Sequence, residues 1–525
     1  MNRNSKHLIF LLFAIFILRA PGLYQPILDI DETVFSEFAN IIIDGGIPYV
    51  EAVDNKPPLM YYFFSSIYLI FGKNNLIAVH FITTIIVMLT AILIYFFGKE
   101  IKNERCGLIS AIVFTALAHI YEPKYISSNG ETIINLPLII SSLLFIKYNK
   151  LNKKEWSFYL VSGFCLGTAV ITNYKAGILS LVFLIHAIIF RGIFSGTAPI
   201  YSSIIRESNR LLIIGFASII PIVIIILYFL NLGNIEESIF WGFTYNLKYI
   251  STGSEAVPLI KTIGRFAYFI VCSLPVWIIS IIFIINKFSS SDVLSFSNEE
   301  KLKDEIFIFL LLWTGFSFYS ATLGGRAYGH YFIQIIVPLS ILCGYAYIHI
   351  IHNLKKVKII FWSFLLIINL LFFLSRIDIN YTYSLINYPN WEADITYQKI
   401  GKYIKENSDP KDKIFAWGWS TPIYYYSNRR CSSRFLIADY ISGRIFGINN
   451  DSQKIKKNSN RKIITDLLKD FNNSPPLYFI DTTRSNLYGY SRFPIKNYDE
   501  LHRIIDKNYT LTKIIDKVDV YKRRF

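Results

Sequence analysis

Residues 211–231 read LLIIGFASIIPIVIIILYFLN and contain no charged side chain. A helix that crosses a bilayer needs about 20 mostly apolar residues, so this run predicts a membrane-spanning helix. The composition of the whole chain agrees, because 53% of its 525 residues are hydrophobic and only 17% are charged. A soluble domain carries roughly 25% charged residues. This composition excludes a disordered protein and disfavours an ordinary cytosolic enzyme.

Ten further apolar runs precede residue 376, and together with 211–231 they predict about eleven transmembrane helices. The predicted spans are 7–24, 75–97, 107–121, 132–147, 157–172, 176–191, 211–231, 265–286, 306–323, 331–351 and 357–375. The chain is thus expected to be an α-helical polytopic membrane protein over residues 1–375.

The composition turns polar over residues 376–525, where a smaller α/β domain is expected. Its predicted strands are 413–417 and 477–480, its predicted helices are 392–406 and 462–471, and 449–460 is a predicted loop.

Lysine and arginine gather in alternate loops between the predicted spans, for example Lys147, Lys150, Lys153 and Lys154. Cytoplasmic loops carry the excess of these residues, so the pattern places the N-terminus in the cytoplasm. Eleven crossings then place the segment after Arg376 outside the cell membrane. Topology also explains the net charge of +16, so membrane lipid is an expected partner and nucleic acid is not. The five cysteines have no CxxC spacing and indicate neither a disulfide framework nor a zinc site.

Two short stretches of the first outer loop predict helices that lie in the membrane interface. Residues 32–43 place apolar side chains on one helical face, with Glu37 and Asn40 away from it. Residues 57–72 begin with Pro57-Pro58, which suits a helix start, and are rich in aromatic residues but too short to cross.

The same loop holds three carboxylates in four residues, Asp29, Asp31 and Glu32. Neighbouring carboxylates repel one another, so they favour binding of a proton, a cation or a divalent metal. The alternative is helix capping, because Asp31 and Glu32 are favourable at the start of a helix. Gly45-Gly46 is read as a turn between the two interfacial helices.

Four predicted loops place further charged residues at the outer ends of spans. Lys56 is a candidate phosphate ligand or a lysine that snorkels to headgroups. Lys175 lies in a hairpin too tight to be a solvated loop, which favours a functional role. Glu131 is a candidate carboxylate or a helix-end group. Arg326 and His330 share a face if their segment is helical, and they would bind an anionic headgroup or anchor the interface.

Carboxylates and cations gathered at the outer ends of spans suit a displacement at a lipid-linked phosphate. A carboxylate deprotonates an acceptor hydroxyl, while cations stabilise the charge that develops on the departing phosphate.

The residues also resemble those of a known family, the polyprenyl-phosphate-sugar-dependent glycosyltransferases of the GT-C superfamily. The resemblance is to the bacterial and archaeal relatives of protein O-mannosyltransferases and aminoarabinose transferases. Its motifs are Arg19-Ala20-Pro21, Asp31-Glu32, Gly45-Gly46-Ile47-Pro48-Tyr49 and Lys56-Pro57-Pro58-Leu59, with Lys175, the 324–331 segment, Trp417-Gly418-Trp419, Tyr424 and Arg429-Arg430 in support.

The resemblance implies an inverting single displacement at the anomeric carbon, with polyprenyl phosphate leaving and an acceptor that is a protein, a lipid or a glycan. Asp31 would be the catalytic carboxylate with Glu32 beside it, and Lys56 and Lys175 would contact the donor phosphate. Glu131 or Glu122 would be the second-loop carboxylate, with Glu131 preferred.

No cofactor is required by the resemblance, and a divalent metal at Asp29 and Asp31 is left open. Asn55 stands where aminoarabinose transferases have a glutamate, which removes one expected metal ligand.

Two other functions compete with the glycosyltransferase. A transporter or flippase for a lipid-linked or anionic solute would place its charges at mid-span rather than at the outer ends. An inactive scaffold of the same fold would have no reason to keep Asp31, Lys56 and Lys175 near lipid. In the polar domain, basic residues that include Arg429, Arg430 and Arg434 predict a solvated face or a surface for an anionic acceptor.

Overall fold

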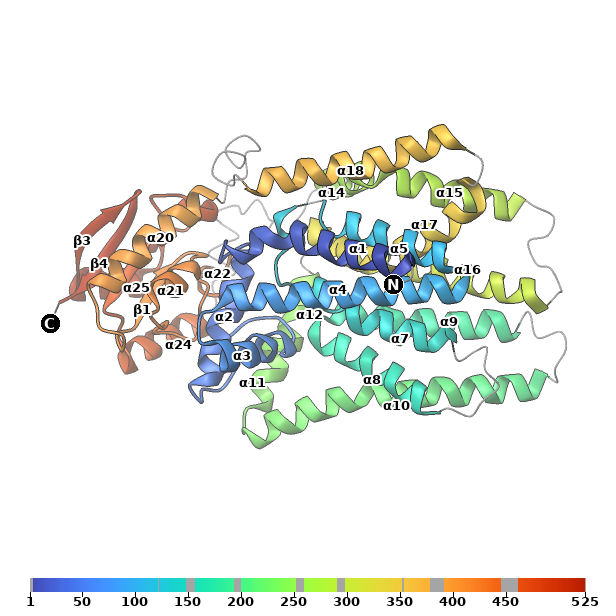
Figure 1. Cartoon of the computed structure of the whole chain (residues 1–525). Helices are drawn as coiled ribbons and strands as arrows, with labels where there is room; N and C mark the ends of the chain where they lie inside the picture. The colour runs from blue at the N-terminus through green and yellow to red at the C-terminus, as the bar shows by residue number, and fades with distance from the viewer. Residues whose placement is uncertain are drawn as a thin grey trace. The chain divides into compact units, whose positions relative to one another are not determined.

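The computed structural model describes nine stretches of the chain (Figure 1). They are residues 3–120, 122–147, 156–192, 200–251, 259–289, 298–351, 354–377, 391–444 and 461–524. The chain divides into two compact units. The helical unit is Met1–Tyr24, Val79–Leu230 and Pro258–Leu374, and the mixed unit is Gln25–Ala78, Asn231–Val257 and Ser375–Phe525. The C-terminal segment therefore shares one unit with the first predicted outer loop. The predicted loop 449–460 lies outside the described residues.

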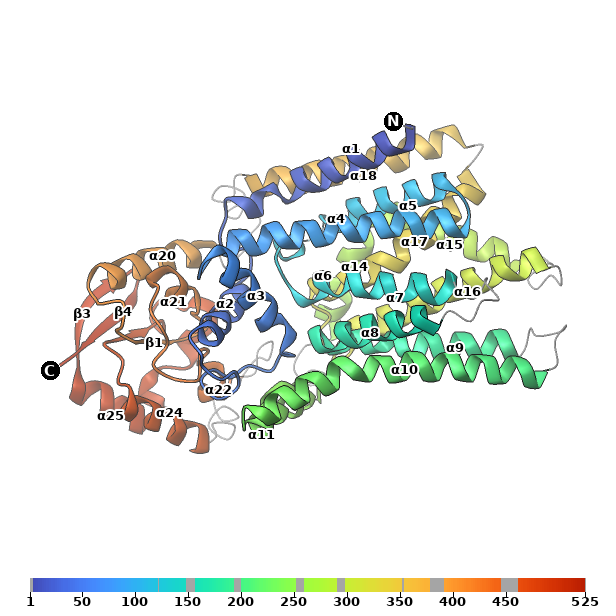
Figure 2. The ribbon, with the colours of Figure 1, turned by 60° about the horizontal axis from the view of Figure 1, so that its bottom comes forward.

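The helical unit consists of long apolar helices and the short turns between them, and Figure 2 shows most of the long helices running roughly parallel. They are α1 (Arg3–Arg19), η1 (Ala20–Leu23), α4 (Leu76–Ile101), α5 (Glu104–Leu117), η2 (Pro123–Tyr125), α6 (Gly130–Ile133), α7 (Asn135–Lys147), α8 (Trp156–Thr172), η3 (Tyr174–Gly177), α9 (Ile178–Gly192), α10 (Ile200–Asn231), α14 (Leu259–Cys272), α15 (Leu274–Ser289), α16 (Asn298–Thr322), η5 (Gly329–Phe332), α17 (Ile333–Ile350) and α18 (Lys355–Ile377).

All eleven predicted spans are helical, so the prediction of a multi-pass helical membrane protein is confirmed. Among the described residues, six helices are long and apolar enough to cross a membrane. They are Lys6–Leu23, Leu76–Ile101, Glu207–Asn231, Glu305–Thr322, Gly329–Ile350 and Lys355–Arg376. Helices α5, α7, α8 and α9 cover four more predicted spans but are shorter. The count of eleven crossings stays a prediction.

The predicted span over 265–286 is not one continuous helix. This run forms two helices, α14 and α15, which are bent by 86° at Ser273. Pro275 is the second residue of α15 and has no backbone N–H to continue the hydrogen-bond ladder of α14. Ser273 instead donates its hydroxyl to the Phe269 carbonyl, at 2.6 Å, and its backbone N–H also bonds to Phe269. A proline alone does not decide such a break, because Pro221 and Pro338 lie inside the continuous helices α10 and α17.

Helix α17 forms the centre of the helical unit and packs against α5, α15 and α16. Gly344 allows the closest approach, because a Cβ at this position would collide with Ser110 of α5. Helices α10 and α18 lie at the outside and expose large apolar side chains such as Phe216 and Leu366. Apolar surface on this scale has lipid as its natural solvent, because water would penalise it.

The mixed unit contains short helices and one four-stranded sheet. Its elements are α2 (Ile30–Ile43), α3 (Leu59–Phe71), α11 (Ile235–Ile239), the π-helix η4 (Phe240–Thr244), α12 (Tyr245–Ser251), α20 (Trp391–Glu406), β1 (Ile414–Trp417), α21 (Pro422–Ser427), α22 (Asp439–Ser442), α24 (Arg461–Asn473), β2 (Tyr478–Asp481), η7 (Leu487–Arg492), η8 (Ile495–Asn497), α25 (Asp499–Asn508), β3 (Tyr509–Ile515) and β4 (Val518–Arg523). The predicted strands 413–417 and 477–480 and helices 392–406 and 462–471 are confirmed within one to two residues.

The sheet has the strand order β1-β2-β4-β3, with β1 and β2 parallel and the other two pairs antiparallel. Successive side chains of a strand point to opposite faces, so β1 contributes to two cores. Ile414 and Ala416 pack with Ile400 and Ile404 of α20 on one face. Phe415 packs against Phe471 of α24 on the other face. Figures 1 and 2 show α20 and α24 on opposite sides of the strands.

Helix α2 forms as predicted, but its polar face is not exposed. Glu37 and Asn40 are both buried, although the sequence placed them away from the apolar face. Glu37 pairs with Arg430 at 3.3 Å, and Asn40 donates to Asn74 at 2.7 Å. The polar residues of α2 therefore face partners within the mixed unit that come from other segments of the chain. Burial raises the pKa of Glu37, and the nearby Arg430 opposes this shift.

Candidate functional site

Two carboxylates in the acidic run of the first loop, Glu32 and Asp31, make different contacts. Glu32 is fully buried and caps α2, because its Oε2 accepts the backbone N–H groups of Leu28 at 3.0 Å and Asp29 at 3.2 Å. Such bonds satisfy donors at a helix start, so the capping alternative holds for Glu32. Asp29 occupies the N-cap position with extended backbone geometry. Asp31 lies in the first turn, and its carboxylate faces Lys56.

Lys56 lies between two aspartates of the mixed unit. Its Nζ is 3.2 Å from Asp31 Oδ1 and 4.0 Å from Asp54 Oδ2, and it lies 4.7 Å from the centre of the Phe35 ring. The side chain of Lys56 is 32% exposed, so its ammonium group remains accessible. Lys56 therefore contacts the acidic run of the first loop through Asp31.

Aromatic hydroxyls fix the position of Lys56 and Asp54. Tyr49 donates its hydroxyl to the Lys56 carbonyl at 2.7 Å. Asp54, which is buried, accepts hydroxyl bonds from Tyr61 at 3.1 Å and from Tyr440 of α22 at 3.0 Å. Burial and the neighbouring carboxylate raise the pKa of both Tyr61 and Tyr440 well above the ordinary value, so both stay protonated donors.

Tyr440 is a residue that sequence reasoning missed. Its ring contacts Trp241 and Tyr245, with ring centres 5.5 Å apart in each case. The 386 positions that separate Tyr440 from Asp54 leave no local pattern that could reveal the contact. Three segments that are distant in the sequence thus meet around Asp54 in the mixed unit.

The helical unit holds a second lysine–carboxylate pair. Lys175 lies in η3, the tight predicted hairpin between α8 and α9, and its Nζ is 3.7 Å from Glu131 Oε1 at the start of α6. Asn173 caps the turn by accepting the Lys175 N–H at 3.1 Å. The ammonium group also lies over the Tyr331 ring, where the negative face of the ring attracts a cation. The pair that the sequence predicted as separate candidates is therefore in contact.

Arg326 and His330 do not share a helical face. Gly324, Gly325 and Ala327 adopt positive φ angles of 78°, 69° and 39°, so the segment is a loop until η5 begins. Arg326 is buried near Tyr331, and burial lowers the pKa of its guanidinium. His330 Nδ1 lies 3.6 Å from Glu122 Oε1. Lys175, Glu131 and Arg326 all act electrostatically on Tyr331, so these three predicted residues gather in one cluster.

Arg19 organises the loop that carries this cluster. Its buried guanidinium donates to the Ile126 carbonyl at 2.7 Å, to the Tyr125 carbonyl at 3.4 Å and to the Thr84 hydroxyl at 3.1 Å. Buried carbonyls need such donors, and an arginine supplies several at once. Arg19 therefore fixes the chain between η2 and α6, just before Glu131.

The described residues contain no group of three or more His, Cys, Asp or Glu side chains arranged to hold a metal ion. Asp29 and Asp31 supply two carboxylates, and Asn55 offers only an amide at the neighbouring position. A hard divalent cation prefers six or more oxygen ligands, so these two carboxylates would need several waters or substrate oxygens to complete a site.

Comparison with known proteins gives one family match and several solved structures. Residues 55–206 match the family described as dolichyl-phosphate-mannose-protein mannosyltransferase. No curated protein sequence matches the chain. The structure of ArnT from Cupriavidus metallidurans bound to undecaprenyl phosphate is similar with a TM-score of 0.64 and 10% identity, over 99% of this chain and 98% of that one.

Two structures of the Archaeoglobus fulgidus oligosaccharyltransferase are also similar. The complex with Zn and sulfate has a TM-score of 0.55 and 10% identity, over 96% of this chain and 71% of that one. The complex of this AglB enzyme with an inhibitory peptide and a dolichol-phosphate has a TM-score of 0.52 and 11% identity, over 97% and 72%. The family match covers less than a third of the chain, and the similarity to the solved structures shows that the whole chain shares their fold.

Proposed function

We propose that this protein transfers a sugar from a polyprenyl-phosphate-linked donor to an acceptor at the outer face of the cell membrane. The observation that carries the proposal is the pairing of Asp31 with Lys56 at 3.2 Å, beside the buried Asp54. A carboxylate that can take a proton and a cation that can hold a phosphate thus lie together. The ArnT and AglB structures with undecaprenyl phosphate and dolichol-phosphate support a donor of this class.

In the proposed reaction, an acceptor hydroxyl attacks the anomeric carbon of the donor sugar. The Asp31 carboxylate accepts the hydroxyl proton, the new glycosidic bond forms, and the bond from the anomeric carbon to the phosphate oxygen breaks. Polyprenyl phosphate leaves with the bonding electron pair, and the anomeric configuration inverts. Glu32 positions Asp31 by capping α2 rather than by touching the substrate.

We assign Lys56 of the mixed unit to the donor phosphate, and Lys175, Arg326 and His330 of the helical unit stay candidate phosphate ligands from the sequence. Cations placed where negative charge develops stabilise a transition state more than a ground state, and removing one such group typically costs about 10²–10³ in rate. Glu131 holds the ammonium of Lys175 at 3.7 Å and is assigned a supporting role. A divalent metal at Asp29 and Asp31 stays a prediction, and none of the proposed steps depends on it.

The proposed topology has a cytoplasmic N-terminus and residues 376–525 outside the cell membrane. The basic loops support this orientation, because cytoplasmic loops carry the excess of lysine and arginine. Cysteine accessibility to an impermeant maleimide tests this orientation in a cysteine-free chain. A single cysteine at Lys102 should react only from the cytoplasmic side, and a single cysteine at Lys411 should react only from the outside.

The function is tested with the purified full chain in detergent. A panel of polyprenyl-phosphate-linked sugars is supplied together with candidate protein, lipid and glycan acceptors, and free polyprenyl phosphate is followed by mass spectrometry. We expect release with at least one sugar and its loss in Asp31→Asn. Repeating the assay with EDTA and with added Mg²⁺ or Mn²⁺ settles the metal. Release from no donor, with folded protein and all acceptors, would overturn the proposal in favour of transport or scaffolding.

A further inference from the structure

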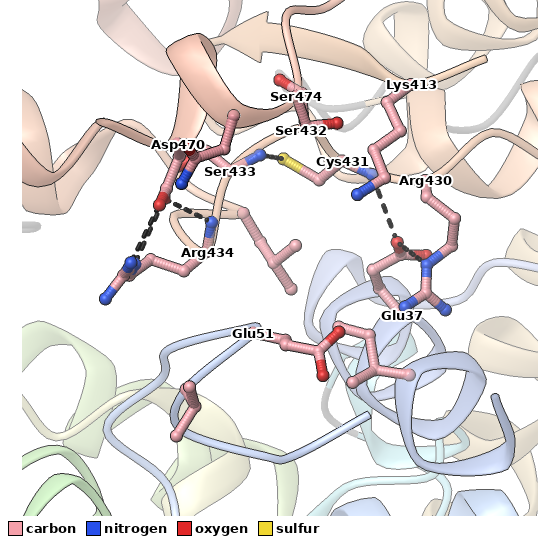
Figure 3. A pocket seen from close by; sticks show the side chains of 14 residues that line it. Glu37, Glu51, Lys413, Arg430, Cys431, Ser432, Ser433, Arg434, Asp470 and Ser474 are labelled. Carbon is pink, nitrogen blue, oxygen red and sulfur yellow. Dashed lines mark hydrogen bonds and ion pairs between the residues drawn. The ribbon is translucent and has the colours of Figure 1, made fainter. Parts of the chain in front are cut away.

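A pocket lies within the mixed unit, and neither Asp31 nor Lys56 lines it (Figure 3). It has a volume of about 260 Å³. Its walls come from the second half of α2, the loop at 50–51, the start of β1, the 430–434 segment and the end of α24. None of the candidate catalytic or phosphate-binding residues lines it.

The pocket carries balanced charge. Arg430 pairs with Glu37 at 3.3 Å, and Arg434 donates to the Asp470 carboxylate at 2.9 Å and 3.2 Å. These ion pairs form part of the wall and are drawn in Figure 3. Lys413 and Glu51 add one further charge of each sign, so the formal charges of the lining cancel. Arg430 and Arg434, which the sequence assigned to a solvated face or to a surface for an anionic acceptor, are each paired with a carboxylate.

Several polar groups of the lining have hydrogen-bonding capacity to spare. Ser432 is only 5% exposed, and its hydroxyl has no hydrogen-bond partner among the described residues. A buried hydroxyl without a partner costs free energy, and a ligand would remove that cost. Lys413 forms no ion pair with any described residue. Glu51 uses one carboxylate oxygen to accept the Ile47 N–H at 3.0 Å, and its second oxygen stays available.

Glu51 is also held in place at the wall. A Cβ at position 46 would lie 2.8 Å from both Glu51 oxygens, so Gly46 leaves room for this carboxylate to fold back. Ile41, Val50 and Leu436 add apolar patches to the same lining. The pocket thus combines separate donors and acceptors with small apolar faces.

We propose that this pocket binds a neutral, hydroxyl-rich glycan, which is the acceptor or the part of the acceptor next to the reacting hydroxyl. Sugar hydroxyls both donate and accept hydrogen bonds, which fits a wall of alternating carboxylates, serines and cations. Sugar rings also present C–H faces to apolar side chains. The charges of the lining cancel, so an anionic ligand would gain no net attraction, and a lipid tail would leave the polar wall unpaired.

The proposal rests on the proposed function, because the position of the pocket relative to Asp31 gives it a role. Glu37 lies six positions after Asp31 on α2, which is about 9 Å along the helix axis. The pocket wall and the catalytic carboxylate thus belong to one rigid helix, about 9 Å apart along its axis.

The first experiment measures binding without catalysis. Purified full-length protein in detergent is titrated calorimetrically with three probes: a panel of neutral tetrasaccharides, an acidic tetrasaccharide, and an uncharged peptide rich in serine and threonine. We expect saturable binding of at least one neutral tetrasaccharide and no binding of the acidic one or of the peptide. Binding of the peptide alone would assign the pocket to a protein acceptor and overturn the proposal of a glycan ligand. Binding of no probe would also overturn that proposal.

A matched pair of variants tests whether the tetrasaccharide binds in this pocket. Asn473 lines the pocket, whereas the adjacent Asn472 does not, and both are exposed near the end of α24. Asn473→Trp should fill the pocket and weaken tetrasaccharide binding at least tenfold, while Asn472→Trp should leave it unchanged. Lys413→Ala, also exposed, should weaken binding several-fold without filling the pocket. Equal affinity of both tryptophan variants and wild type would overturn the proposal.

A second readout separates this proposal from the proposed function. Slow release of polyprenyl phosphate from the donor to water needs no acceptor, so Asn473→Trp should keep this release and lose only the acceleration by the glycan. Glycan binding without donor cleavage in wild type would refute the glycosyltransferase while leaving the pocket. Donor cleavage that no bound glycan accelerates would refute the pocket as the acceptor site.

Discussion

Lys56 and Lys175 each face a carboxylate, but their surroundings differ. Lys56 belongs to the mixed unit, is 32% exposed and has Asp31 and Asp54 within 4.0 Å. Lys175 belongs to the helical unit, is 20% exposed, lies over the Tyr331 ring and faces Glu131 alone, whose side chain is 8% exposed. One lysine is thus held by a network of aspartates and tyrosines, and the other by a single buried carboxylate and a ring.

This difference determines how much each ion pair contributes to the stability of the fold. A partly exposed ion pair gains little stability, so Lys56 and Asp31 are free to serve chemistry. A buried pair depends on both partners, because removing one leaves an uncompensated charge in a medium of low dielectric. Loss of Lys175 should therefore affect folding as well as activity, whereas loss of Lys56 or Asp31 should affect activity alone.

Asp31→Asn should have the largest effect on activity. The amide cannot accept the proton of the acceptor hydroxyl, and loss of a general base typically costs about 10²–10⁴ in rate. Donor cleavage by mass spectrometry measures the effect, with the melting temperature in detergent as the check on folding. Asp44→Asn is the control, because Asp44 is an exposed carboxylate of the same loop and should keep wild-type activity. Equal losses in both variants would contradict the role of Asp31.

Lys175→Met should lower kcat/KM by about 10²–10³ and also destabilise the protein. The buried Glu131 then lacks its partner, which costs about 3–5 kcal/mol when a buried pair is broken. Adding Glu131→Gln to this variant should restore the melting temperature but not the activity. Recovery of both properties in the double variant would show that Lys175 has only a structural role.

Tyr440→Phe should cause a smaller loss, because it removes one hydrogen bond to Asp54 and leaves Lys56 in place. Such a bond contributes about 1 kcal/mol, or roughly a fivefold change in rate. The expected change is in KM for the donor, and it should vanish in a Lys56→Met background, since interacting residues are not additive. A loss of the same size in both backgrounds would mean that Tyr440 acts independently of Lys56.

The smallest expected effect is a pH dependence of stability at Glu37. Burial raises the pKa of Glu37, so the folded state holds its proton more tightly than the unfolded chain does. The resulting stability is present below the ordinary pKa of a glutamate and is lost as pH rises through the raised pKa. Glu37→Gln cannot ionise, so its melting temperature relative to wild type should rise from about pH 4 to pH 7. A constant difference across this range would show that Arg430 fully compensates the burial.

The outcome at α2 and in the sheet shows how far local patterns reach. The strands at 414–417 and 478–481 and the helices around them were predictable, because a buried apolar run and a 3.6-residue period are local signals. The burial of Glu37 and Asn40 was not, since their partners Arg430 and Asn74 lie elsewhere in the sequence. A helix period shows which residues share a face but not what covers that face.

The candidate site divides in the same way. The sequence pointed to Asp31, Lys56, Glu131 and Lys175, because charged residues at the ends of apolar spans are costly and stand out. It left open whether Asp31 or Glu32 caps α2, and hydrogen-bond geometry settled this for Glu32. It also missed Tyr440, which bonds to Asp54 across 386 positions.

The sequence by itself determined that the chain is a multi-pass helical membrane protein with a polar α/β segment, because hydrophobic run length and periodicity depend only on neighbouring residues. The sequence did not predict the break at Ser273 within the run 265–286. The tertiary structure alone decided which carboxylate meets which lysine, that Arg430 and Arg434 are neutralised, and that a charge-balanced pocket lies beside α2. Those features depend on contacts between distant segments, which form only when the apolar cores pack and bring the charges together.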